Sequence, residues 1–160
     1  MDALRGKVIG VVDDERDVRD GLAEVLGMWR CRPVVAASAL ELCEQLDAAD
    51  TRPDAFIADF RLREHEGGTA AVALLRERYG AGLPALIMTG DTSPDVLTLV
   101  RAQRLPLLFK PVRASRLRAA LQHLLSDARQ LRSAVAVESS DPAAAIGAAL
   151  PGGSAPALRS

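Results

Sequence analysis

Five short apolar runs, each followed by a helix-forming stretch, limit the possible folds of this chain more than any other feature. The runs cover residues 7–12, 31–37, 54–59, 84–90 and 105–110. Apolar residues dominate them, as in strands that are covered on both faces. Parallel strands require crossovers, so this alternation predicts an α/β fold with a five-stranded, doubly wound parallel sheet and helices on both faces. Pro33 cannot donate to a strand ladder, which predicts either that the second strand lies at an edge of the sheet or that the proline stands at the start of the strand.

Local signals predict where several of the helices begin and end. Ser38 and Glu41 have the spacing of a capping box and open the stretch that follows the second run. Gly80 is well suited to end the helix after the third run. Ser93 and Pro94 are suited to be the cap and first residue of the next helix.

The periodicity also predicts the domain limits. A chain of 160 residues with 49% hydrophobic residues can bury one core of ordinary size. We expect a lead-in over residues 1–6, one domain over 7–128, and a tail over 129–160. The tail is rich in Ala, Ser, Gly and Pro, which predicts a flexible segment or linker.

Charge and cysteine content narrow the classes of partner and compartment. The formal net charge of -1 gives no general attraction to nucleic acid or to anionic membranes, so we expect neither as a partner. Cys31 and Cys43 have no metal-ligand spacing, and we expect reduced thiols that pack in the core. No secretory signal or long apolar segment is recognisable, which predicts a cytoplasmic protein.

Polar residues lie at the carboxyl ends of four of the five predicted strands, and these residues carry the functional signal. They are Asp13 and Asp14, Asp59, Thr89, and Lys110. The carboxyl ends of parallel strands meet at one edge of the sheet, where ligands bind in such folds. Three carboxylates at one place require a compensating cation, and oxygen ligands of this kind suit Mg2+. The lysine and the hydroxyl are suited to hold a phosphoryl group.

As a set, the motifs "DD", "IAD", "MTG" and "FKP" at these strand ends resemble the receiver domain of response regulators in two-component signalling. The resemblance covers roughly residues 7–125. It implies that Asp59 accepts a phosphoryl group from a phosphohistidine. It also implies that Asp13 and Asp14 hold Mg2+ together with Asp59 and the backbone carbonyl of Arg61.

The same resemblance implies roles for the other strand-end residues. Thr89 would be the switch hydroxyl, and Lys110 would contact the phosphoryl oxygens and precede a cis peptide bond to Pro111. The implied sheet is flavodoxin-like, with strand order 2-1-3-4-5. The implied partners are a histidine kinase or histidine phosphotransfer protein, and a second copy through the face formed by the fourth and fifth helices. Such a domain catalyses its own phosphoryl transfer and dephosphorylation but contains no kinase core.

One departure from the family pattern concerns Leu107, three residues before Lys110, where many regulators carry an aromatic residue. This leucine, "TGDTSP" and "LPLLFKPV" are most similar to the receivers at the C-terminus of hybrid sensor histidine kinases. A free-standing receiver is the alternative. In this family, the positions two residues beyond the acceptor and two residues beyond the switch hydroxyl flank the path by which water reaches the aspartyl phosphate. Arg61 and Asp91 carry opposite charges at these positions, so we expect them to pair across the mouth of the site and hinder attack by water. The alternative is two solvated side chains that do not meet.

Each residue also has a simpler explanation when it is taken alone. Asp13 and Asp14 could start a helix, and Asp59 could cap a turn. Two other functions also stay open at this point. One is a pseudo-receiver that binds partners without phosphorylation. The other is a phosphatase similar to haloacid dehalogenases, although that family requires Asp-x-Asp and Arg61 stands at the second of these positions.

Overall fold

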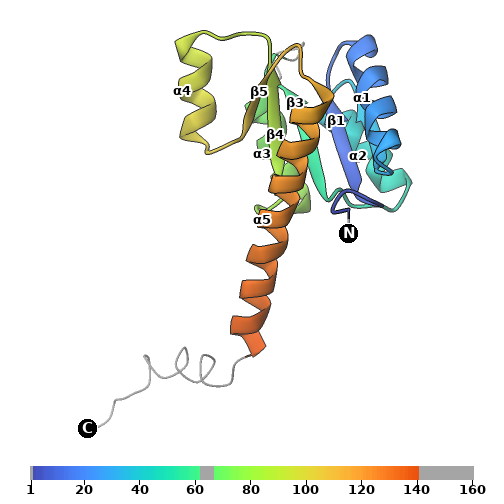
Figure 1. Cartoon of the computed structure of the whole chain (residues 1–160), viewed down its shortest axis with the longest axis vertical. Helices are drawn as coiled ribbons and strands as arrows, with labels where there is room; N and C mark the ends of the chain where they lie inside the picture. Colours follow the sequence, from blue (N-terminus) through green and yellow to red (C-terminus); the bar gives the residue numbers. More distant parts are fainter. Residues whose placement is uncertain (1, 62–66, 141–160) are drawn as a thin grey trace, which may run out of the picture. The chain divides into compact units, whose positions relative to one another are not determined.

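The computed structural model describes residues 2–61 and 67–140, with the backbone alone described over 131–140. The chain divides into two units, Met1–Ser126 and Asp127–Ser160. The strands are β1 (Val8–Val12), β2 (Arg32–Ala36), β3 (Ala55–Asp59), β4 (Ala85–Thr89) and β5 (Leu107–Phe109). The helices are α1 (Arg16–Met28), α2 (Ala39–Ala48), α3 (Gly68–Tyr79), α4 (Pro94–Ala102) and α5 (Ala114–Ser140). Strand and helix alternate strictly along the chain, as the sequence predicts (Figure 1).

The five strands form one parallel sheet in the order β2-β1-β3-β4-β5, which confirms the predicted topology. β2 is an edge strand, and Pro33 lies in it opposite Ile9 of β1. The edge position explains why a residue without a backbone N–H is tolerated there.

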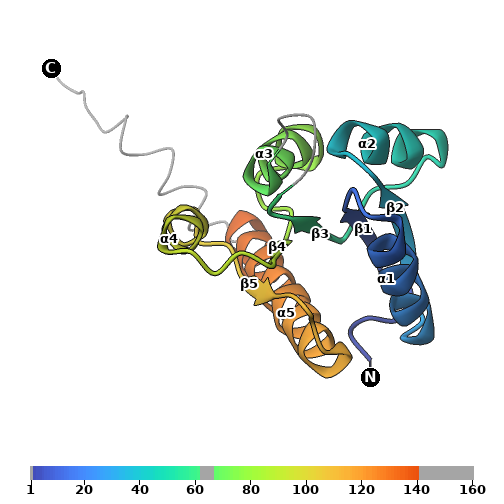
Figure 2. The ribbon, with the colours of Figure 1, turned by 90° about the horizontal axis from the view of Figure 1, so that it is seen from above.

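Helices cover both faces of the sheet (Figure 2). The buried side chains form two separate hydrophobic clusters, one on each face. On one face α2, α3 and α4 contribute residues such as Leu42, Leu75 and Val100, all fully buried. On the other face α1 contributes Leu26 and the first part of α5 contributes Leu121, also fully buried. Because successive strand residues point to opposite faces, continuous apolar strands supply both clusters at once.

The predicted helix signals are largely present. The Glu41 amide donates to Ser38 Oγ over 3.1 Å, and the Glu41 carboxylate accepts from the Ala37 amide over 3.0 Å. Gly80 follows α3 with a φ of 121°, which favours glycine. Ser93 precedes α4 as expected, but its side chain makes no cap hydrogen bond. The carboxylate of Asp91 accepts from the Ser93 amide instead, over 2.8 Å.

The last helix runs further than the sequence suggests. α5 continues to Ser140, into the range 129–160 where we expect the tail, while the domain limit at residue 128 stays a prediction. The rest of the predicted tail, residues 141–160, lies outside the described residues. Within the described part of the chain, no helix has the length and apolar character needed to cross a membrane.

Both cysteines are free and buried, as predicted. Cys43 belongs to the cluster under α2, and Cys31 belongs to the cluster on the opposite face of the sheet. Burial raises the pKa of the Cys31 thiol to about 11, which keeps it protonated and unreactive at neutral pH. Packing therefore accounts for both residues.

Candidate functional site

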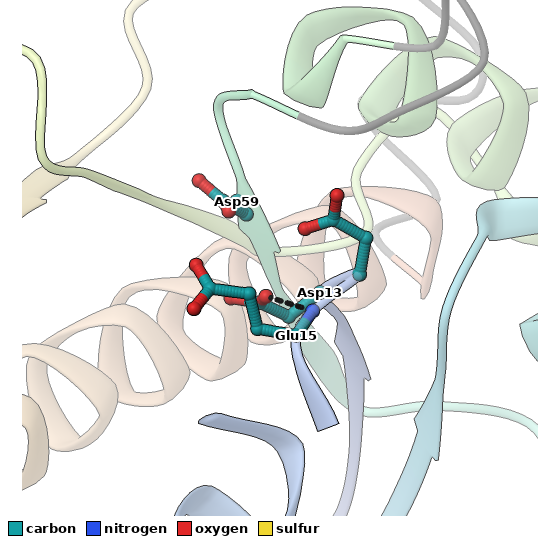
Figure 3. A group of neighbouring side chains, drawn as sticks. Asp13, Glu15 and Asp59 are labelled. Carbon is teal, nitrogen blue, oxygen red and sulfur yellow. Dashed lines mark hydrogen bonds between the residues drawn. The ribbon is translucent and has the colours of Figure 1, made fainter. Parts of the chain in front are cut away.

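Two neighbouring strands bring the acidic residues together at one edge of the sheet. Asp13 directly follows β1, and Asp59 is the last residue of β3. Val12 of β1 is paired with Ala58 of β3, so the next residue of each strand lies at the same level. Asp13 and Asp59 are only 2% and 6% exposed. The parallel register thus places two buried carboxylates side by side (Figure 3).

Four acidic residues at this edge form a cluster that could hold a cation. Asp13, Asp14, Glu15 and Asp59 each offer one carboxylate oxygen, and these oxygens all lie within 4.8 Å of one another. Hard oxygen donors of this kind fit Mg2+. Asp13 also shapes the segment, because its Oδ1 accepts from the Glu15 amide over 2.9 Å (Figure 3).

Glu15 is a member of this cluster that the sequence reasoning missed. The available signal was its place as the third of three consecutive acids, directly before α1. The predicted role of the Arg61 carbonyl stays a prediction. The backbone amide of Arg61 does reach the site, since it donates to Asp59 Oδ1 over 3.2 Å.

Lys110 joins the two buried carboxylates. Its ammonium donates to Asp59 Oδ2 over 3.0 Å and to Asp13 Oδ2 over 3.1 Å. Lys110 directly follows β5, and its peptide bond to Pro111 is cis, as the resemblance implies. The single positive charge of Lys110, at the end of β5, therefore compensates the two carboxylates at the ends of β1 and β3.

The protonation of this group follows from burial and pairing. Burial raises the pKa of the Asp59 carboxyl, while the hydrogen bond from Lys110 acts in the opposite direction without cancelling it. Burial alone would lower the pKa of Lys110, but its hydrogen bonds to Asp59 and Asp13 outweigh this and raise it. Lys110 therefore stays charged, whereas Asp59 is held ionised less firmly than an exposed carboxylate would be.

Thr89 ends β4 and is completely buried. Its hydroxyl accepts from the Asp91 amide over 2.9 Å and lies 3.4 Å from the Asp91 carbonyl, to which it can donate. The hydroxyl is therefore engaged by its own segment. A role as a switch requires these contacts to change.

The predicted pair between Arg61 and Asp91 is present. The Arg61 guanidinium forms an ion pair with Asp91 Oδ2, although the two residues follow different strands. This guanidinium, together with the Ser93 amide, holds the pKa of Asp91 at about 2, below its usual value of 3.8. Whether the pair slows hydrolysis is a separate prediction.

Several of these groups line one pocket at the strand ends. Its lining residues are Asp14, Glu15, Asp59, Arg61, Gly90, Asp91, Thr92 and Lys110. The pocket offers carboxylate oxygens for a divalent cation, two cationic side chains for an anion, and one buried carboxylate as a nucleophile. This combination suits transfer of a phosphoryl group to Asp59.

Comparison with known proteins agrees with this arrangement. A family model described as "Response regulator receiver domain" matches residues 9–122, which is most of the chain. The chain belongs to the response regulator receiver family. It is therefore a receiver domain of two-component signalling. A search of curated proteins finds no match.

Solved structures with the same fold include several receivers. A response regulator receiver domain protein from Clostridium thermocellum is 21% identical, with a TM-score of 0.69, over 78% of this chain and 98% of that one. The chemotaxis protein CheY4 from Vibrio cholerae is 24% identical, with a TM-score of 0.64, over 75% of this chain and 98% of that one. NtrX from Brucella abortus is 22% identical, with a TM-score of 0.72, over 82% of this chain and 29% of that one. At these identities, the likeness supports the fold alone.

Proposed function

We propose that this receiver accepts a phosphoryl group from a phosphohistidine onto Asp59 in a two-component phosphorelay that requires Mg2+. The observation that carries the proposal is the contact of one lysine with two buried carboxylates. Lys110 lies 3.0 Å from Asp59 and 3.1 Å from Asp13, in a pocket that also contains further acids. Such an arrangement has little structural value, because buried charges are costly to maintain. It is well suited to a reaction in which charge arrives at Asp59.

In the proposed reaction, a carboxylate oxygen of Asp59 attacks the phosphorus of the phosphohistidine. A P–O bond forms as the P–N bond breaks, and the departing imidazole nitrogen takes a proton from solvent. The Lys110 ammonium, already beside Asp59, then binds a phosphoryl oxygen. Thr89 donates its hydroxyl to another oxygen after leaving the Asp91 backbone.

The acidic cluster supplies the residues that would hold Mg2+. Asp13, Asp14 and Asp59 would hold the ion, and the Glu15 carboxylate, which belongs to the same cluster, would be a further candidate ligand. When bound, Mg2+ neutralises charge between the carboxylates and the incoming phosphoryl oxygens. Since it also favours the ionised carboxylate, it should counter the effect of burial on Asp59.

The test is chemical phosphorylation followed by intact mass measurement. Incubation with acetyl phosphate or phosphoramidate should add the mass of one phosphoryl group only when Mg2+ is present. Asp59→Asn should abolish the addition, whereas Asp54→Asn, one residue before the other end of β3, should leave it intact. Continued labelling of Asp59→Asn would refute the assignment, and an unlabelled wild-type protein would favour the pseudo-receiver.

Two finer features belong to the same proposal. We propose the C-terminus of a hybrid sensor histidine kinase as the context of this domain, and the sequence of the full parent chain tests that. We also propose a homodimer through the face of α4, β5 and α5, because Leu99 and Phe109 are 52% and 45% exposed there. Light scattering with and without fluoroberyllate, a phosphoryl mimic, should show a mass increase that Phe109→Ser removes.

A further inference from the structure

Arg61 touches the acceptor with its backbone and a second carboxylate with its side chain. Its amide donates to Asp59 Oδ1 over 3.2 Å, and its guanidinium pairs with Asp91. The Arg61 side chain is 70% exposed, whereas that of Asp91 is 21% exposed. The guanidinium is therefore held at the pocket by one ion pair and has solvent around it in which to move.

Asp91 in turn holds the segment between β4 and α4. Its Oδ1 accepts from the Ser93 amide over 2.8 Å, at the residue directly before α4. Its own amide donates to Thr89 Oγ1 over 2.9 Å. A continuous series of contacts thus runs from Asp59 through Arg61 and Asp91 to the start of α4.

Phosphorylation would place a second anion within reach of the same guanidinium. Asp59, Arg61, Asp91 and Lys110 all line one pocket, so phosphoryl oxygens on Asp59 would lie between the two cationic side chains. An aspartyl phosphate carries more negative charge than a single carboxylate, and a guanidinium fork matches phosphate oxygens well. The Asp91 carboxylate should then bind the Arg61 guanidinium less strongly than the phosphoryl group on Asp59 does.

We propose that the Arg61 guanidinium changes partner, from the Asp91 carboxylate in the unmodified domain to the phosphoryl oxygens on phosphorylated Asp59. This inference rests on the proposed function and adds Arg61 as a phosphoryl-binding residue. Asp91 loses its ion pair in the exchange, which loosens the segment before α4. The state of Asp59 is thereby communicated to α4 in a domain that carries Leu107 where an aromatic residue could otherwise report it.

The test is a double-mutant cycle on the affinity for fluoroberyllate with Mg2+, measured by calorimetry. Arg61→Ala should weaken binding about tenfold, as expected for loss of a hydrogen bond to a charged group. Asp91→Asn should tighten binding roughly two- to fivefold, because an exposed pair of this strength no longer competes. Asparagine can still accept from the Ser93 amide, so the start of α4 is retained.

The decisive comparison is the combined variant. In the Arg61→Ala background, Asp91→Asn should no longer tighten binding. If the tightening persists in full, the Asp91 carboxylate acts through its charge alone and the exchange is refuted. Arg78→Ala removes another exposed arginine–aspartate pair, with Asp47, and should bind like the wild type.

Decay of the phosphorylated protein gives an independent readout by mass. Asp91→Asn should slow hydrolysis, because Arg61 stays on the phosphoryl group, and Arg61→Ala should hasten it. If the pair instead stayed closed over the site, both single substitutions would speed up hydrolysis of the aspartyl phosphate. That result would overturn the exchange. Wild-type protein that neither binds fluoroberyllate nor gains phosphoryl mass would overturn the proposed function itself, and the exchange with it.

Discussion

Gly68, the first residue of α3, lies against the backbone of the acceptor strand, and Gly68→Ala tests how closely the two must approach. A methyl group at this position would lie 2.5 Å from the carbonyl oxygen of Asp59 and 2.8 Å from the Cα of Phe60. The Gly68 amide also donates to the Phe60 carbonyl over 2.9 Å. These neighbours are backbone atoms, so they cannot rotate away as a flexible side chain would.

The expected loss follows from these distances. Relief of the contacts requires a separation of about 0.5 to 1 Å between the start of α3 and the end of β3. Overpacking of this kind costs about 1–3 kcal/mol, and weakening the Gly68 hydrogen bond adds to it. The better helix propensity of alanine offsets less than about 1 kcal/mol. We therefore expect a net loss of about 1–3 kcal/mol, or a fall in Tm of roughly 4–12 °C.

The assay is thermal and urea unfolding of Gly68→Ala beside Gly67→Ala. Gly67 is a matched control, because among the described residues a methyl group there would meet just the Phe60 carbonyl oxygen, at an ordinary 3.7 Å. Gly67 is the N-cap residue of α3, and alanine is a poorer cap, so the Gly67→Ala variant should lose less than about 1 kcal/mol. Phosphorylation of Asp59 should also slow in Gly68→Ala, since the acceptor strand is displaced. Equal stability of the two variants would show that the close approach does not constrain the fold.

Three further predictions concern charge and packing. Lys110→Met should destabilise the domain at neutral pH, because the buried carboxylates of Asp13 and Asp59 lose the cation between them. Added Mg2+ should increase the stability of this variant more than that of the wild type. Because pairing with Arg61 lowers the pKa of Asp91 from 3.8 to about 2, the ion pair stabilises the fold above pH 3.8, and this stabilisation is lost as the pH falls toward 2. The free energy of unfolding of Arg61→Ala should therefore depend less on pH between 3.8 and 2 than that of the wild type. Leu121→Ala should lose about 2–5 kcal/mol in urea unfolding because the side chain is fully buried, whereas Leu40→Ala, 63% exposed, should lose less than about 1 kcal/mol.

The sequence by itself determined the order of the strands and helices and the edge that carries the polar residues. Strand-length apolar runs can be recognised locally, and a residue that follows a parallel strand must lie at the carboxyl edge of the sheet. Pro33 is an intermediate case, because its missing N–H predicted a sheet edge or a strand start, and the observed sheet has β2 at its edge. The opposite charges of Arg61 and Asp91, at positions that the family resemblance placed beside the acceptor, predicted a pair that the structure contains.

Only the tertiary structure decided how these side chains meet. Glu15 belongs to the acidic cluster, and its amide donates to Asp13 Oδ1. Lys110 contacts two carboxylates from the end of β5, where Phe109 is paired with Thr89 of β4. The tight fit of Gly68 against Asp59 depends on where α3 packs. Such facts depend on distances between residues that are far apart in the chain. Local periodicity carries no information about those distances, because they are fixed only when the sheet register and the helix packing are established together.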